Sequence, residues 1–368
     1  MEMWRLWLGG LCGIATLAGH SPATGAGEIV PGVPALELCI PPKLAQWEKQ
    51  RKEIRRTLWQ LLGELPPRPK RLKVSVIERA HRSEGFTVEK FTFDNGAGAI
   101  VTGYICIPDG LKGRAPAILY CHQHGGLYGV GKEEIFKTEP TPQAPAVELT
   151  RRGYVLLAID AYCFGERSGK GPAGESEKGG AEELTMSKLN LWLGRSLWGM
   201  MIRDDLMALD YLASRPEVDA RRIGVTGMSM GSTRSWWIAA LDDRPAAAVC
   251  VCCLTRYQDL IAMGQLRAHG SYYFVPGMLR HFDTEAVVSL IAPRPLLTLT
   301  GDQDSGSPIS GVNKINAVTR QIYGLYGKGD RFGGKVYPGV PHQYAPEMWR
   351  EMLDWFERWL EKGSSPIA

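Results

Sequence analysis

The stretch RIGVTGMSMGSTRSWWIAAL, residues 222–241, joins a strand pattern to a helix pattern through a turn of small residues. Ser229 stands at the turn, between Gly227 and Gly231, in the arrangement G-x-S-x-G. Glycines two positions before and after a serine let the backbone pass close to itself, which a sharp strand-to-helix turn requires. The stretch therefore predicts a strand, a tight turn and a helix, with Ser229 at the apex as a candidate nucleophile. The alternative is a glycine turn that only packs the helix on the sheet.

Short apolar runs of similar character occur along most of the chain. They are bounded by turn residues, as in APAILYC, GYVLLAID, AAAVCVCC, PRPLLTLTG and GGKVYPG. Runs of this kind are typical of strands that are buried on both faces. Helical patterns fall between most of them, at residues 145–152, 197–214, 232–241, 309–326 and 346–360. Strands that alternate with helices predict an α/β fold with a mostly parallel central sheet and helices on both faces.

The first third of the chain has a different pattern. Residues 41–66 place apolar side chains at helical spacing and end in glycine and prolines, which predicts an amphipathic helix. Residues 72–108 look like extended strands that include an Asn-Gly turn. We therefore expect an N-terminal extension over residues 27–71 and the main domain over residues 72–368. Within that domain, residues 161–198 are rich in glycine and charge, and a connection of this length is either an insertion or a lid over the site.

Residues 1–26 have the parts of a secretory signal peptide. One arginine precedes an apolar segment at residues 6–19, and small residues follow before Ala26. The apolar segment is short for a membrane span. We expect cleavage near Ala26, export to the periplasm or the medium, and no stable membrane insertion after processing. The alternative is a membrane-tethering helix.

The composition is that of an ordinary globular protein. The chain has 368 residues, 44% of them hydrophobic, and its 43 basic and 39 acidic residues give a net charge of +4. A balance this even gives no reason to expect a nucleic-acid partner. Most of the eight cysteines lie in strand-like runs, which indicates small buried side chains, and no pair has zinc-ligand spacing backed by histidines. We expect no metal and no organic cofactor. The sequence does not decide whether any two of the cysteines form a disulfide.

A serine hydroxyl needs a base to take its proton and an acid to orient that base. Three histidines follow Ser229 in the chain, namely His269, His281 and His342. His342 lies in PGVPHQY, on a loop directly after the last strand pattern, whereas the other two precede the strand that should carry the acid. His342 is therefore the predicted base.

The acid is expected on the loop GDQDSGSP, which follows the strand PRPLLTLTG. This loop offers two carboxylates, Asp302 and Asp304. Asp304 has cleared the end of the strand and is the predicted acid, while Asp302 is expected to bind loop amides as a turn residue. Asp283 is a further candidate.

An acyl-transfer site also needs donors for the oxyanion that develops during the reaction. The N–H of Met230 is one such donor, because Met230 follows Ser229 at the amino end of a helix. The second is expected from the loop CHQHGG, from the N–H of His124 with that of Gln123 as the alternative. The side chains of His122 and His124 are expected to bind loop backbone rather than a metal.

With these residues in view, the chain resembles the α/β-hydrolase superfamily, and within it the dienelactone-hydrolase-like and acetyl-xylan-esterase-like group. The resemblance rests on PAILYCHQHGG, AIDAYCFGER, GMSMGSTRSWW, APRPLLTLTGDQD and PGVPHQY in this order. It implies the α/β-hydrolase fold, with Ser229, Asp304 and His342 as nucleophile, acid and base. Gln123 departs from the pattern, because relatives typically have glycine there. The serine nucleophile departs from dienelactone hydrolases, which use cysteine, and is more similar to carboxylesterases.

The expected function is that of a serine hydrolase that cleaves carboxylic esters through an acyl-enzyme. The resemblance implies short-chain or acetyl esters, of small molecules or of carbohydrates. One alternative is a peptidase of the prolyl-oligopeptidase type, although the residues before the oxyanion loop are too few for a β-propeller. The other is a non-catalytic binding protein of the same fold, since fold alone does not imply function.

Overall fold

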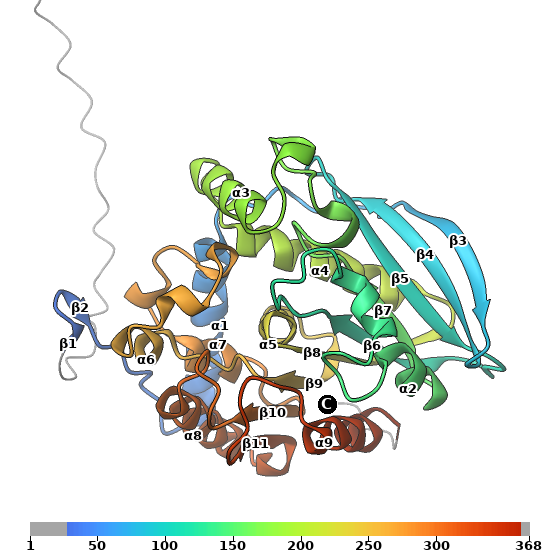
Figure 1. Cartoon of the computed structure of the whole chain (residues 1–368). Coiled ribbons are helices and arrows are strands. Elements are labelled where there is room, and N and C mark those ends of the chain that lie inside the picture. Colours follow the sequence, from blue (N-terminus) through green and yellow to red (C-terminus); the bar gives the residue numbers. More distant parts are fainter. Residues whose placement is uncertain (1–27, 362–368) are drawn as a thin grey trace, which may run out of the picture.

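A central sheet organises the molecule, and the computed structural model describes residues 28–361 of it (Figure 1). The strands of this sheet are β3 Val74–Arg82, β4 Phe86–Asp94, β5 Ile100–Pro108, β6 Ala115–Cys121, β7 Val155–Ile159, β8 Val218–Met228, β9 Pro245–Val251, β10 Leu296–Gly301 and β11 Phe332–Tyr337. Within the described residues their order is β11-β10-β9-β8-β6-β7-β5-β4-β3. Neighbours from β11 to β7 pair in parallel, and neighbours from β7 to β3 pair antiparallel. The predicted mostly parallel sheet is confirmed.

Helices lie before, between and after the parallel strands. They are α1 Leu44–Leu62, α2 Pro145–Arg151, α3 Gly180–Trp192, α4 Leu197–Ser214, α5 Met230–Leu241, α6 Tyr257–Ala262, α7 Thr284–Ser289, α8 Ile309–Leu325 and α9 Pro346–Phe356. A π-helical turn, Glu357–Glu361, continues α9, and a small hairpin of β1 Glu28–Val30 and β2 Val33–Pro34 precedes α1. The signal peptide predicted at residues 1–26 lies outside the described residues.

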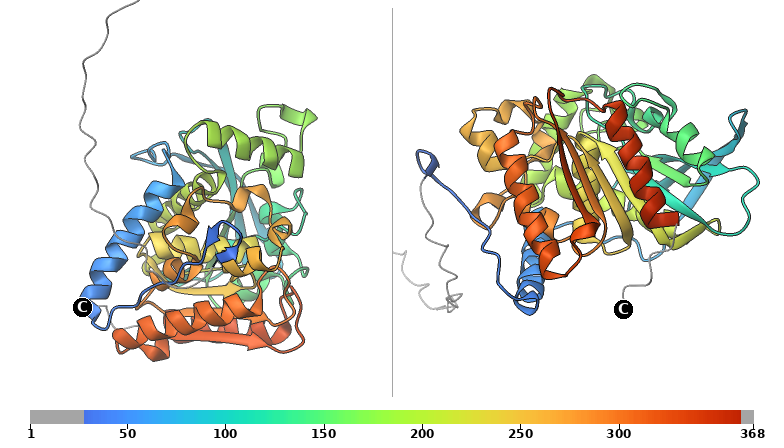
Figure 2. Two further views of the ribbon diagram at one scale, coloured as in Figure 1. Left: turned by 90° about the vertical axis from the view of Figure 1, so that its left-hand side faces the viewer. Right: turned by 90° about the horizontal axis from the view of Figure 1, so that it is seen from below.

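The two faces of the sheet form separate hydrophobic cores, and both are covered by helices (Figure 2). Successive side chains of a strand point to opposite faces, and β6 shows the consequence. Its Leu119 packs in one core with side chains of α1, α4, α5, α7 and α8. Its Ile118 and Tyr120 pack in the other core with side chains of α2 and α9. This two-sided burial explains why the strands have continuous apolar runs instead of an alternating pattern.

The N-terminal helix is part of the first of these cores. Trp47 and Leu58 of α1 are fully buried there, as the helical spacing of residues 41–66 predicts. Arg51 and Arg55 on the same helix bind Asp243, which follows α5. The extension therefore packs on the main domain by apolar and ionic contacts.

Local patterns missed three of the helices. The short helices α6 and α7 lie in segments for which no element was predicted. The third, α3, lies within residues 161–198, which the sequence marks only as a long connection. In Figure 1, α3 projects at the edge of the molecule, on the side of α4 that faces away from β8. All seven described cysteines are unpaired, so no disulfide joins any two of them.

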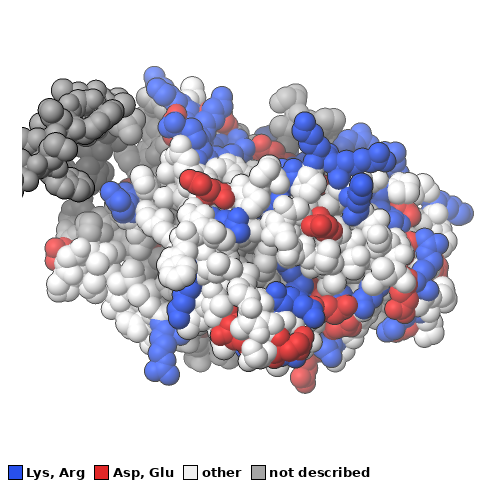
Figure 3. Space-filling model, turned by 90° about the horizontal axis from the view of Figure 1, so that it is seen from above, with Lys and Arg blue, Asp and Glu red and all other residues white. Residues whose placement is uncertain are grey.

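The carboxyl ends of the parallel strands meet at one edge of the sheet, where open α/β sheets bind ligands. The loops after β6, β8, β10 and β11 carry His124, Ser229, Asp304 and His342 respectively. Basic and acidic side chains both occur on the face seen from above, with a broad uncharged area between them (Figure 3). None of the helices within residues 28–361 combines the length and the apolar character needed to cross a membrane.

Candidate active site

Ser229 lies at a sharp turn between β8 and α5. Its φ of 58° is in the left-handed region, which residues other than glycine rarely adopt. The flanking glycines are required by space, since a Cβ on Gly227 or on Gly231 would overlap the carbonyl oxygen of Cys121 in β6. The predicted strand–turn–helix unit is confirmed, and α5 begins at Met230, two residues earlier than its pattern indicates.

The structure brings Ser229, His342 and Asp304 together in one line. Ser229 Oγ lies 2.9 Å from His342 Nε2, and His342 Nδ1 lies 2.8 Å from Asp304 Oδ2. With its proton on Nδ1, the imidazole donates to Asp304 and accepts from the Ser229 hydroxyl. Asp304 is buried and also accepts the N–H of Gly306 at 2.9 Å, whereas His342 is partly open to solvent. The Asp304 carboxylate is therefore held in place, and the His342 ring stays accessible to a ligand from solvent.

The other two carboxylates weighed from the sequence have structural partners. Asp302 accepts the N–H of Gly339 at 2.7 Å, so it does bind a loop amide, but one that follows β11 and not one of its own turn. Asp283 caps α7 and accepts the N–H groups of Tyr257, Gln258 and Thr284. Neither of these two carboxylates has a hydrogen bond to His342 among the described residues.

The two remaining downstream histidines also have other environments. His269 stacks on Tyr273 with 4.6 Å between ring centroids, and its Nε2 lies 3.0 Å from the carbonyl oxygen of Gly306. Burial lowers the pKa of His269, which therefore favours the neutral ring. His281 is exposed and lies against Phe282.

The structure distinguishes the two oxyanion candidates on the loop after β6. The N–H of Gln123 donates to the Glu134 carboxylate at 3.0 Å and is therefore engaged. This leaves the N–H of His124 as the candidate on that loop. Met230 is the first residue of α5, and the first N–H groups of a helix have no acceptor within the helix.

Buried side chains also bind the backbone of the loop after β6. His122 is fully buried, its Nδ1 donates to the Gln123 carbonyl oxygen at 2.7 Å, and its Nε2 accepts the Ala161 N–H at 3.1 Å. Burial holds the pKa of His122 well below its ordinary value, so the ring stays neutral. Glu134 accepts the Tyr120 hydroxyl in addition to the Gln123 amide. The expectation that His122 binds loop backbone is confirmed.

The side chain of His124 is held by α3. Its Nε2 lies 2.9 Å from Glu183 Oε2, and its Nδ1 accepts the Gly126 N–H at 3.1 Å, so Nε2 carries the proton. Glu183 is buried and also accepts the Tyr128 hydroxyl at 3.1 Å, while Tyr272 stacks on the His124 ring. The expectation that the His124 side chain binds backbone is therefore only half right. Glu183 is a residue that the sequence did not single out, because it lies 59 positions away.

A cavity of about 380 Å³ opens beside Ser229 and His342. Tyr272 lines it and is otherwise buried, so it serves both the pocket and the core. The cavity is lined by His124, Gly125, Gly126, Ser229, Cys253, Ala268, His269, Gly270, Tyr272, Asp304, Ser305, Gly306 and His342. Its volume suits a small ligand.

Two cysteines lie close to this line of residues. Cys253 Sγ is 3.7 Å from Ser229 Oγ, and burial raises the pKa of its thiol to about 12, which keeps it protonated and a poor nucleophile. Cys252, Asp304 and His342 place one possible metal-ligand atom each within 4.8 Å of one another. Two of these three are the acid and base candidates, so this group does not form a separate site.

Arg234 on α5 has an ionic partner inside the protein. It is fully buried, and its Nε and Nη2 lie 2.9 and 2.5 Å from the two carboxylate oxygens of Asp205 in α4. The ion pair joins α5, the helix that follows Ser229, to α4. Trp236 and Trp237 are buried as well, in agreement with a packing role.

The fold and this arrangement of side chains are those of the α/β-hydrolase class. A family model described as "Abhydrolase family" matches residues 37–317, and the chain belongs to this family. "Putative hydrolase YtaP" of Bacillus subtilis is 38% identical over 312 residues, which are 84% of this chain and 100% of that protein. These matches confirm the resemblance to the α/β-hydrolase superfamily stated from the sequence.

Solved structures of similar fold include two esterases. A glucuronoyl esterase from Solibacter usitatus has a TM-score of 0.64 at 18% identity, over 94% of this chain and 99% of that one. A "putative acetyl xylan esterase" from Bacteroides fragilis has a TM-score of 0.63 at 20% identity, over 83% of this chain and 81% of that one. At these identities the likeness concerns the fold.

Proposed function

We propose that this protein is a serine esterase in which Ser229, His342 and Asp304 act as nucleophile, base and acid. The observation that carries the proposal is the continuous line of two contacts, 2.9 Å from Ser229 Oγ to His342 Nε2 and 2.8 Å from His342 Nδ1 to Asp304 Oδ2. A proton can pass along the first contact, and the second orients the ring and stabilises its charged form.

In the proposed mechanism His342 takes the Ser229 proton as Oγ attacks the ester carbonyl carbon. The oxyanion that forms accepts the N–H groups of Met230 and His124. Collapse of this intermediate breaks the bond to the alcohol oxygen, to which His342 returns the proton, and an acyl-Ser229 ester remains. Water then loses a proton to His342, attacks the acyl carbon, and the carboxylic acid leaves as Ser229 regains its proton. The steps require no metal or organic cofactor.

The proposed substrates are short-chain esters, acetyl esters in particular, of small molecules or carbohydrates. The size of the catalytic cavity, about 380 Å³, favours a small acyl group. The names of the two structural relatives, an acetyl xylan esterase and a glucuronoyl esterase, add support for a carbohydrate ester. We further propose, from the pattern of residues 1–26, that the protein is exported.

Labelling and turnover test the proposed function together. Purified protein is incubated with a fluorophosphonate probe and, separately, with an aryl acetate and with acetylated sugars. We expect labelling and turnover in the wild type and in Ser83→Ala, which removes an exposed serine between β3 and β4, and loss of both in Ser229→Ala. A wild type that neither labels nor turns over ester would favour the non-catalytic alternative, and turnover of peptides alone would favour the peptidase.

A further inference from the structure

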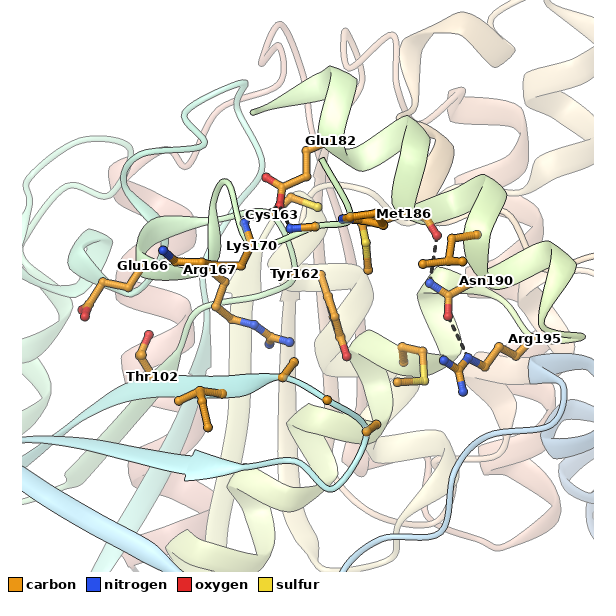
Figure 4. Close-up of a pocket in the computed structure, with 18 residues that line it drawn as sticks. Thr102, Tyr162, Cys163, Glu166, Arg167, Lys170, Glu182, Met186, Asn190 and Arg195 are labelled. Atoms are coloured by element: carbon orange, nitrogen blue, oxygen red, sulfur yellow. Dashed lines mark hydrogen bonds between the residues drawn. The ribbon is translucent and has the colours of Figure 1, made fainter. Parts of the chain in front are cut away.

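A second cavity, of about 630 Å³, is lined in part by α3 (Figure 4). It is enclosed by the start of β5, the loop after β7, and the chain from α3 to the first turn of α4. It shares no lining residue with the cavity at Ser229. Helix α3 lines the second cavity with Met186, Leu189 and Asn190, and its Glu183 contacts His124, which lines the first. The volume is in the range of pockets that bind small organic molecules.

The walls of this second cavity are largely apolar. Met186 and Leu189 come from α3, Met200 from α4 and Ile100 from β5. Figure 4 shows the Tyr162 ring between Arg167 and Met186. The Tyr162 hydroxyl oxygen accepts the Asn95 side-chain N–H at 3.1 Å. An apolar body is therefore the kind of group that these walls would remove from water.

Most charged side chains around the cavity already have partners. Arg167 stacks on Tyr162 and pairs with Asp204 at 2.9 Å. Glu182 accepts three backbone N–H groups of the loop at residues 169–171. Glu166 pairs with Lys90 and Lys132, and Lys170 on the rim lies 3.4 Å from Glu175.

Arg195 is the exception among the charged side chains that line this cavity. Its Nε donates to Asn190 Oδ1 at 2.8 Å, and Asn190 is itself fixed because its Nδ2 donates to the Met186 carbonyl oxygen at 2.8 Å. No Asp or Glu within residues 28–361 forms an ion pair with Arg195, and its two terminal nitrogens have no acceptor there. The Arg195 guanidinium is therefore held in place beside the cavity, and its two terminal nitrogens can donate to a ligand.

We propose that this second cavity is a binding site for an amphipathic monocarboxylate. The ligand carboxylate accepts hydrogen bonds from the N–H groups of both terminal nitrogens of Arg195, an arrangement that matches the planar fork of a guanidinium. Its hydrocarbon or aromatic body lies against Tyr162, Met186 and Leu189. Arg195 is one cation without an ion-pair partner among the described residues, and the other charged side chains of the lining are paired or hydrogen-bonded, so a monoanion suits the site better than a phosphate dianion, whose second charge would stay unpaired. The proposal does not depend on the proposed esterase activity.

Calorimetric titration with phenylbutyrate tests the proposal, with phenylbutyramide as a neutral ligand of the same shape. We expect saturable binding of the carboxylate to the wild type and at least about tenfold weaker binding of the amide, since the charge-assisted contacts are lost. In Arg195→Gln the carboxylate should weaken about tenfold or more while the amide changes little, so that the preference for charge disappears.

A second variant and a second protein background locate the binding. Met186→Trp fills the chamber and should abolish binding of both ligands, and thermal unfolding of each variant checks that it folds. All titrations are repeated in Ser229→Ala, whose binding should equal that of the wild type. Absence of binding, equal affinity for acid and amide, or carboxylate binding that Arg195→Gln leaves unchanged would each overturn the proposal. The last outcome would place the ligand elsewhere, for example at the oxyanion donors beside Ser229.

Discussion

Asp304 and Asp302 are neighbours on one loop with different surroundings. Asp304 contacts His342, and Asp302 contacts the Gly339 N–H of the following loop. The pair allows a matched test of the proposed acid, because each carboxylate accepts a hydrogen bond and only one of them reaches the base.

We predict that Asp304→Asn lowers kcat for an aryl acetate by about 10⁴-fold, the effect known for loss of the triad carboxylate elsewhere, because an amide no longer secures the required tautomer of His342. Asp302→Asn should change kcat by less than roughly threefold, within the range of ordinary surface changes. Steady-state kinetics on both variants measure this. A larger loss in Asp302→Asn would assign the acid to Asp302 instead.

Glu134 binds the loop after β6 and is expected to make the stability of the protein depend on pH. Burial raises the pKa of its carboxyl from 4.5 to about 7, so the folded protein binds this proton more tightly than the unfolded chain. The contribution of Glu134 to stability is therefore full below about pH 4.5 and is lost as pH rises through about 7. The difference corresponds to about 3 kcal/mol.

We predict that Glu134→Gln, which has no proton to lose, gains stability relative to the wild type as pH rises from 5 to 8. The Tm of the variant minus that of the wild type, measured by calorimetry across this range, should increase steadily. A difference that stays constant with pH would show that Glu134 keeps its charge in the folded protein.

At the scale of elements, α3 is the helix that connects the segment at residues 161–198 to the candidate active site. It places two adjacent glutamates differently: Glu182 binds the loop amides at residues 169–171, and Glu183 binds His124. Only the second reaches the loop whose N–H is proposed to bind the oxyanion. The helix thus acts as a support for that loop.

We predict that Glu183→Gln lowers kcat about tenfold with little change in KM, because a displaced oxyanion donor weakens transition-state binding and not substrate binding. A complete loss of one donor would cost about 10²-fold or more. Glu182→Gln is the matched control and should lower thermal stability without this effect on kcat. Equal kcat losses in the two variants would indicate a general loosening of α3 instead.

At the scale of the whole molecule, the N-terminal helix α1 is bound into the same core as the sheet. Trp47 on its inner side is fully buried, whereas Trp59 on the same helix is 36% exposed. The extension at residues 27–71 is therefore expected to contribute to the stability of the main domain.

We predict that Trp47→Ala lowers the free energy of unfolding by about 3–5 kcal/mol, the usual effect of removing a buried tryptophan, and that Trp59→Ala lowers it by less than about 1 kcal/mol. Urea denaturation followed by circular dichroism measures both. Similar values for the two variants would mean that α1 contributes little to the common core.

The sequence by itself determined most of the strands and helices along the chain, the turn at Ser229, and the loops that carry Asp304 and His342. These features depend on local periodicity and turn chemistry, which neighbouring residues specify. It could not show α3, because this helix has an inverted pattern. Its Leu184, Leu191 and Trp192 are exposed, whereas its Glu182 and Glu183 are buried.

Only the tertiary structure decided what depends on contacts between distant residues. It binds the Gln123 N–H to Glu134, so that the His124 N–H is the remaining oxyanion candidate on that loop. It also brings Glu183 to the His124 side chain and buries Arg234 against Asp205. It also leaves Arg195, which lies beside a second cavity, without an ion-pair partner among residues 28–361. The physical reason is that a buried polar group must find its partner in space, and the chain can supply that partner from any position.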